Sequence, residues 1–142
     1  MRTQVVLASL LVRLAFAQPP VPQPIAPQSL QWTSPPTLAG LQSAWVVGAE
    51  QRTGLYLLRV KLAAGTRIPP HTHPDERAST VLQGTLYVGF GETFDEAKLV
   101  PVAAGAVYVA PANVPHYIWA KDGPAEYQES GIGPTGTIML KR

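Results

Sequence analysis

The feature that most constrains the fold is a series of short segments in which apolar and polar residues alternate. In residues 54–62, Leu58, Val60 and Leu62 alternate with two basic side chains, which is the period-two pattern of a half-buried strand. Similar segments occupy residues 79–82, 85–90, 106–110, 117–120 and 137–140, with glycine or proline between them. Many short strands, frequent turn residues and almost no helical periodicity predict an all-β domain, either a sandwich or a barrel.

Residues 93–98 carry the one indication of a helix. Thr93 and Glu96 have the spacing of a capping box, which predicts a single helical turn that ends at Lys98. In this interpretation Asp95 and Glu96 begin a helix rather than form a catalytic pair of carboxylates.

The N-terminal part of the chain is expected to lie outside the folded domain. Residues 1–17 contain an apolar run and a small-residue pattern that predict a signal peptide cleaved after Ala17, and hence an exported protein. Arg13 interrupts the apolar run, so an amphipathic or unfolded leader stays open as an alternative. Residues 18–36 contain seven prolines and are predicted to form an extended spacer. The domain is therefore expected to span residues 37–142.

Composition excludes several classes of protein. With 46% hydrophobic and 14% charged residues, the chain is too apolar to be disordered. The basic residues are scattered rather than clustered, which argues against a nucleic-acid partner. Cleavage of the leader would remove Arg2 and Arg13 and leave nine of the 11 basic residues, which equals the number of acidic residues. The remaining chain is expected to have no segment for membrane contact. The chain has no cysteine, so any metal must be held by nitrogen and oxygen ligands.

The chemistry of the chain is concentrated in its three histidines, His71, His73 and His116. On an extended strand, residues i and i+2 point to the same side, so the imidazoles of His71 and His73 are able to reach one ion. Such a pair taken alone is also compatible with histidines that bind no metal.

The residues around these histidines resemble the two motifs of the cupin superfamily. Gly65 precedes His71 by the spacing of the first motif, and Gly84 closes that motif; Gly105, Pro111 and His116 have the spacing of the second. The resemblance covers residues 54–120 directly. It implies a double-stranded β-helix, or jelly-roll barrel, in which the three histidines converge. Their imidazoles would then hold one divalent transition metal ion (Fe, Mn, Ni, Cu or Zn).

The chain departs from the first motif at the position of its glutamate. The motif places that residue at position 77 or 78, where this chain has Arg77 and Ala78, while Glu76 lies one residue early. A bulge beside Pro74 would turn Glu76 inward as a fourth metal ligand. Regular alternation instead sends Glu76 outward and Arg77 inward, where its guanidinium would bind a carboxylate on a substrate.

The second motif differs at two positions. Asn113 replaces a glycine, a change that a left-handed turn tolerates. Ala120 replaces an asparagine, and alternation from His116 is expected to point Ile118 and Ala120 inward and Tyr117 and Trp119 outward. These positions predict an apolar-walled cavity above the ion.

Three functions are compatible with this sequence. The first is a metal-dependent enzyme that acts on a small metabolite by oxygenation, isomerisation or decarboxylation. The second is a non-catalytic module that binds or senses a small ligand or a metal. The third is a domain whose main role is assembly, since the resemblance implies pairing through edge strands. A homodimer suits all three functions.

Overall fold

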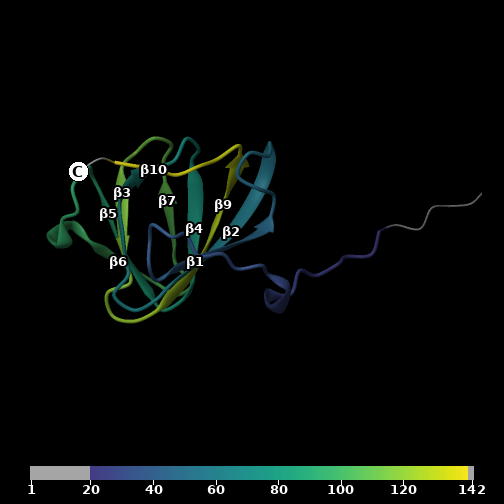
Figure 1. Ribbon diagram of the computed structural model, residues 1–142, viewed down its shortest axis with the longest axis horizontal. Helices are drawn as coiled ribbons and strands as arrows, with labels where there is room; N and C mark the ends of the chain where they lie inside the picture. Colours follow the sequence, from purple (N-terminus) through teal and green to yellow (C-terminus); the bar gives the residue numbers. More distant parts are fainter. Residues whose placement is uncertain (1–19, 141–142) are drawn as a thin grey trace, which may run out of the picture.

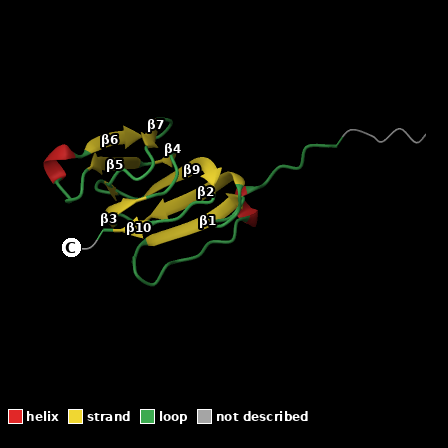
Figure 2. Cartoon of the chain, turned by 90° about the horizontal axis from the view of Figure 1, so that it is seen from above, coloured by secondary structure: helices red, strands yellow, loops and turns green. Residues whose placement is uncertain are grey.

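The computed structural model describes residues 20–140 and consists of two antiparallel sheets that face each other (Figures 1 and 2). The first sheet has the strand order β1 (Leu41–Val47), β2 (Gly54–Leu62), β9 (Ala125–Gly133), β4 (Arg77–Gln83), β7 (Val107–Ala110). The second has the order β10 (Ile138–Met139), β3 (Arg67–Thr72), β8 (His116–Trp119), β5 (Thr85–Phe90), β6 (Val100–Ala103). Two short 3-10 helices, η1 (Pro27–Ser29) and η2 (Glu96–Lys98), lie outside the sheets. The predicted all-β barrel is confirmed.

The space between the sheets is filled by side chains from alternate positions of the strands. Val60 and Leu62 of β2 meet Leu86 and Val88 of β5 and Ile118 of β8 in one apolar cluster, and each is at most 4% exposed. Because the inward positions recur with period two, each strand contributes its apolar side chains to the same cluster. This cluster fills one part of the barrel interior. Buried polar residues, which include the three histidines and Arg77, occupy another part.

Strands β2 and β5 have the bounds that the sequence predicts, and β4, β7, β8 and β10 differ from their predicted bounds by one or a few residues. The sequence patterns missed β1, β3, β6 and β9. In β3, two consecutive prolines, Pro69 and Pro70, hide the strand signal, and the register with β8 shifts between Ile68 and His71. In β9, the inward positions include Glu129 and two glycines, so the apolar alternation is weak.

The predicted helical turn is confirmed, but its cap is not Thr93. The N-cap of η2 is Asp95, whose carboxylate accepts a hydrogen bond from the backbone N–H of Ala97 at 3.0 Å. The shorter turn therefore begins two residues later than a capping box on Thr93 requires.

The proline-rich segment contacts the barrel before residue 37. Leu30 is 9% exposed, Thr33 pairs with Ser43 of β1 through two backbone hydrogen bonds, and the ammonium of Lys61 lies 4.0 Å from the ring centre of Trp32. These contacts attach the end of the predicted spacer to the first sheet. The predicted leader, residues 1–17, lies outside the described residues. Within residues 20–140, no helix is long and apolar enough to span a membrane.

The turn before β8 fixes the loop that carries His73. Asn113 has a φ of 61°, the left-handed conformation predicted for it, and its backbone N–H donates to the carbonyl of His73 at 2.7 Å.

We expect Asn113→Gly to leave the free energy of unfolding nearly unchanged. Asn113→Val should lower it by about 1–2 kcal/mol, because a β-branched residue is strained at positive φ. Urea unfolding of both variants checks this, and equal stabilities would contradict it.

Candidate metal centre

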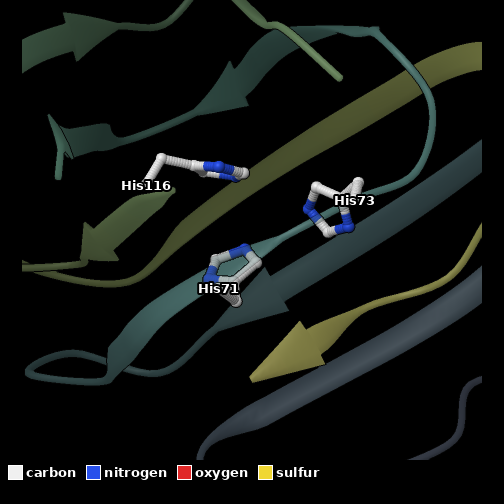
Figure 3. A group of neighbouring side chains, drawn as sticks. All are labelled: His71, His73 and His116. Atoms are coloured by element: carbon white, nitrogen blue, oxygen red, sulfur yellow. The ribbon is translucent and has the colours of Figure 1, made fainter. Parts of the chain in front are cut away.

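Three buried imidazoles meet inside the barrel (Figure 3). His71 of β3 and His116 of β8 lie directly opposite each other on paired strands, and their ring centres are 4.3 Å apart. His73 follows β3, with its ring centre 4.9 Å from that of His71 and 5.1 Å from that of His116. One ligand atom from each of the three lies within 4.8 Å of the others. The three side chains are at most 3% exposed.

Hydrogen bonds to the backbone set the tautomer of each imidazole. The Nδ1 atoms of His71, His73 and His116 lie 2.7, 2.7 and 3.1 Å from the carbonyl oxygens of Pro69, Gly136 and Val114, respectively. A carbonyl only accepts, so each Nδ1 carries the proton and donates it. The lone pair of each neutral ring is therefore on Nε2. Among the described residues, the buried Nε2 atoms of His73 and His116 have no hydrogen-bond partner.

Burial keeps these imidazoles neutral. It lowers the pKa of His71 to about 4, helped by the nearby His116, and the pKa of His73 to about 3, helped by the positive charge of Arg77. Burial also lowers the pKa of His116. Neutral imidazoles with free Nε2 lone pairs are the form that binds Fe, Mn, Ni, Cu or Zn. The residues present therefore fit a divalent transition metal ion.

These pKa shifts predict how the stability of the metal-free protein depends on pH. Below an unfolded pKa of about 6.5 the unfolded chain binds protons that the buried imidazoles reject. The contribution of the histidines to the free energy of unfolding is therefore complete above about pH 6.5. It falls as the pH is lowered towards the folded pKa values near 4 for His71 and 3 for His73. Each histidine contributes up to about 1.4 kcal/mol per pH unit in this window. Urea unfolding of the chelator-treated protein at several pH values checks this; a flat profile between about pH 6.5 and 4.5 would contradict it.

The structure separates Glu76 from the three histidines. The Glu76 side chain is exposed, whereas Arg77 points into the barrel and is 3% exposed. This is the arrangement expected from regular alternation, not the bulged one that would bring Glu76 inward.

Arg77 is held by two carboxylates rather than left free for a substrate. Its Nη1 donates to Oε2 of Glu129 at 2.8 Å, and its Nη2 donates to Oδ1 of Asp75 at 2.8 Å and to the hydroxyl of Thr135. The sequence suggested that Arg77 binds a carboxylate on a substrate. Both Nη atoms of the guanidinium already donate to side chains of the protein, which argues against that role. Only its Nε lacks a partner within the described chain.

Asp75 joins the elements around Arg77 into one network. Its carboxylate accepts hydrogen bonds from the hydroxyls of Tyr56 and Thr135, each at 2.5 Å. Burial alone would raise the pKa of Asp75, but the hydrogen bonds from Thr135, Tyr56 and Arg77 outweigh it and hold the pKa below its usual value. The network ties β2, β4 and the segment before β10 together.

Glu129 is the second carboxylate partner of Arg77, and sequence reasoning missed its position. It lies in the middle of β9, faces the interior and is 5% exposed. The available signal was the alternation of Ala125, Tyr127 and Glu129, all of which are buried. A strand assignment for 125–133 would have placed Glu129 inside the barrel.

A cavity of about 540 Å³ opens beside the histidines, between the two sheets and the N-terminal segment. This size suits a small organic molecule. Its polar wall includes His71, His73, Arg77, Glu129 and Thr135. Its apolar wall is formed by Leu38, Leu41, Trp45, Leu58, Val60, Ile68, Tyr127 and Met139, among others.

The apolar wall comes from residues other than those expected. Ala120 and Ile118 do point inward and are at most 1% exposed, but they pack in the core cluster and do not line the cavity. Tyr117 is fully buried although it was expected to face outward. Its ring lies 4.8 Å from that of Phe94 and its hydroxyl donates to the carbonyl of Asp95 at 3.0 Å, so the segment before η2 covers it.

Comparisons with known proteins agree with this architecture. The family model described as Cupin domain matches residues 58–129. Germin-like protein 3-1 of Oryza sativa subsp. japonica is 36% identical over 73 residues, which are 51% of this chain and 32% of that protein. The chain thus matches about a third of the length of this relative.

Solved structures share the fold. The polyketide cyclase RemF from Streptomyces resistomycificus has a TM-score of 0.71 at 12% sequence identity. The matched residues are 86% of this chain and 87% of the cyclase chain. An oxalate oxidase has a TM-score of 0.53 at 27% sequence identity. The matched residues are 61% of this chain and 46% of the oxalate oxidase chain. At these identities the similarity to the cyclase concerns the fold alone.

Proposed function

Because this chain belongs to the cupin domain family, we propose that it is a metal-dependent enzyme that converts a small molecule in the cavity beside its three histidines. The metal is one divalent transition ion held by the Nε2 atoms of His71, His73 and His116. When bound, such an ion supplies Lewis-acid or redox chemistry to an oxygen atom of the ligand. Oxygenation, isomerisation and decarboxylation are all compatible with this proposal.

One observation carries the proposal: backbone carbonyls hold all three Nδ1–H groups, and one ring nitrogen of each histidine lies within 4.8 Å of the others. Partners of this kind fix the ring orientation of metal-binding histidines. A set of three histidines that served only to fill the core would leave buried Nε2 atoms unpaired at a cost in stability. The adjoining cavity gives a ligand access to His71 and His73.

Enzymes among the proteins of similar fold support the catalytic part of the proposal. One of them is an oxalate oxidase and another a polyketide cyclase, so this fold serves more than one reaction. The fold alone does not select the reaction. The chain's own residues contribute a cavity that is apolar on one side and polar on the other, which orients a ligand with a polar end toward His71 and His73.

Glu76 is expected to have no role in metal binding, since its side chain is exposed. Glu76→Gln should therefore keep the metal content and the metal affinity of the wild type within about twofold, as most surface substitutions do. Competition against a chromophoric chelator measures the affinity. A loss of about tenfold or more would show that Glu76 turns inward to act as a fourth ligand.

A panel experiment tests the proposed activity. The metal-loaded protein is incubated with small hydroxy acids, keto acids and enols, and the products are followed by mass spectrometry beside the His116→Ala variant. Conversion by the wild type and not by His116→Ala supports the enzyme. Binding of panel members without conversion would replace it with a non-catalytic ligand-binding module.

A further inference from the structure

Glu129 lies on the sheet that faces the histidines. It belongs to β9 of the first sheet, whereas His71 belongs to β3 of the second (Figure 1). Both side chains line the cavity between the sheets. His71, His73 and Glu129 therefore line one cavity and are able to meet the same ligand. Only Oε2 of this carboxylate is used by Arg77, and within residues 20–140 no hydrogen bond to Oε1 is present. Because Glu129 lines the cavity, Oε1 is free to meet a ligand.

The charges around Arg77 do not balance. Two carboxylates, Asp75 and Glu129, share one guanidinium, and the three side chains are at most 8% exposed. Asp75 is further stabilised by the hydroxyls of Tyr56 and Thr135, so it holds its negative charge. The uncompensated negative charge then falls on Glu129, whose second oxygen has no donor. A buried carboxylate without full compensation readily accepts a proton.

We infer that Glu129 is the proton acceptor of this cavity, and that its ligand is a small molecule whose weakly acidic hydroxyl, of the enol or phenol class, loses its proton to Oε1 on binding. In this step the O–H bond of the ligand breaks and an O–H bond to Oε1 forms, with no change in oxidation state. The negative charge moves from Glu129 to the ligand oxygen. The inference rests on the proposed function, since the bound metal ion would stabilise that oxygen anion.

The surroundings of Glu129 support this role. Burial raises the pKa of Glu129 above its usual value, and Arg77 counteracts the shift only in part. The nearby charge of Asp75 raises the pKa of Glu129 further. Burial, and then the charge of Glu129, raises the pKa of Tyr108 and Tyr127, so both tyrosines stay neutral. A carboxylate of raised pKa is a better base toward a weak acid. Its anchoring by Arg77 holds the free oxygen in a fixed position.

The competing explanation is that Glu129 serves only to neutralise Arg77. A structural role would affect the stability of the fold and leave the protonation of a ligand unchanged. The two explanations therefore differ in the number of protons that ligand binding releases to the solvent. Glu129→Gln separates them, because an amide keeps an oxygen that accepts from Arg77 but cannot take up a proton.

The experiment uses catechol as the probe and the full chain loaded with Zn(II), which does not oxidise it. Isothermal titration calorimetry at about pH 7 in buffers of different ionisation enthalpy gives the affinity and the protons released per bound catechol. The variants are Glu129→Gln and, as the matched control, Glu126→Gln on the same strand, where Glu126 faces Arg59 at 3.8 Å in a partly exposed pair. Veratrole, the dimethyl ether of catechol, is the probe without an acidic hydroxyl. Bound zinc and thermal unfolding are measured for every variant.

We expect Glu129→Gln to weaken catechol binding by at least about tenfold, as for loss of a charged hydrogen-bond partner. It should also release about one more proton per catechol than the wild type, with zinc content and veratrole binding unchanged. Glu126→Gln should behave as the wild type. Equal proton release in the wild type and Glu129→Gln, or no catechol binding by the zinc-loaded wild type, would overturn the inference. Failure of the wild type to bind zinc would instead contradict the proposed function.

Discussion

Replacing His71 by Ala is expected to weaken binding of a divalent transition metal by about a hundredfold or more. His71 lies at the centre of the site, opposite His116 on the paired strand and one residue from the strand end that leads to His73. Loss of a partner outside the ligand shell already costs about 10–100-fold in metal affinity, so loss of a ligand itself costs at least as much. Titration with Zn(II) or Co(II) against a competing chelator measures the change.

His71→Asn is the control for the fold in this experiment. Its side-chain amide keeps a donor near the position of Nδ1, where it is able to donate to the carbonyl of Pro69, but it lacks Nε2. We expect His71→Asn to fold as the wild type does and to lose metal affinity as His71→Ala does. Wild-type affinity in both variants would show that His71 is not a ligand.

Replacing Arg77 by Met is expected to lower the free energy of unfolding by about 3–5 kcal/mol, the usual effect of removing one partner from a buried ion pair. The variant leaves Asp75 and Glu129 buried without their counter-charge. Because the unpaired carboxylates accept protons more readily, the destabilisation should become smaller as the pH is lowered. Urea unfolding at neutral and acid pH measures both effects.

Lys98→Met is the matched control, since it removes a cation from an exposed pair. Lys98 lies 3.5 Å from Asp95 and the two side chains are 69% and 41% exposed. Such pairs contribute about 0–1 kcal/mol, so this variant should unfold almost as the wild type does. If Arg77→Met were equally harmless, the guanidinium would be free to serve a substrate, as the sequence had suggested.

The all-β fold was predictable because the strands β2 and β5 alternate clearly and end at turn residues. The convergence of the histidines was also foreseeable, since their motif spacing resembles that of a known family. Strand β3 was not recognised because Pro69 and Pro70 resemble a turn, although they lie in a strand next to a register shift. Here pairing with β8 outweighs the local preference of the residues.

The network around Arg77 could not be predicted because it joins residues far apart in the chain. Arg77 meets Glu129, which is 52 positions away, and Thr135, which is 58 positions away. Period-two alternation shows that Arg77 points inward but not which partner it meets there. That partner depends on β4 and β9 being neighbours in the sheet, a property of topology that no short sequence pattern carries. The export signal and the homodimer remain predictions.

Binding of one metal ion by the three imidazoles can be tested by X-ray absorption spectroscopy of the protein purified without added metal, with elemental analysis of the same sample. We expect about one Fe, Mn, Ni, Cu or Zn per chain and an ion whose nearest shell contains three imidazole nitrogens. A protein that contains no metal and takes up none, or an ion whose ligands are not imidazoles, would contradict it.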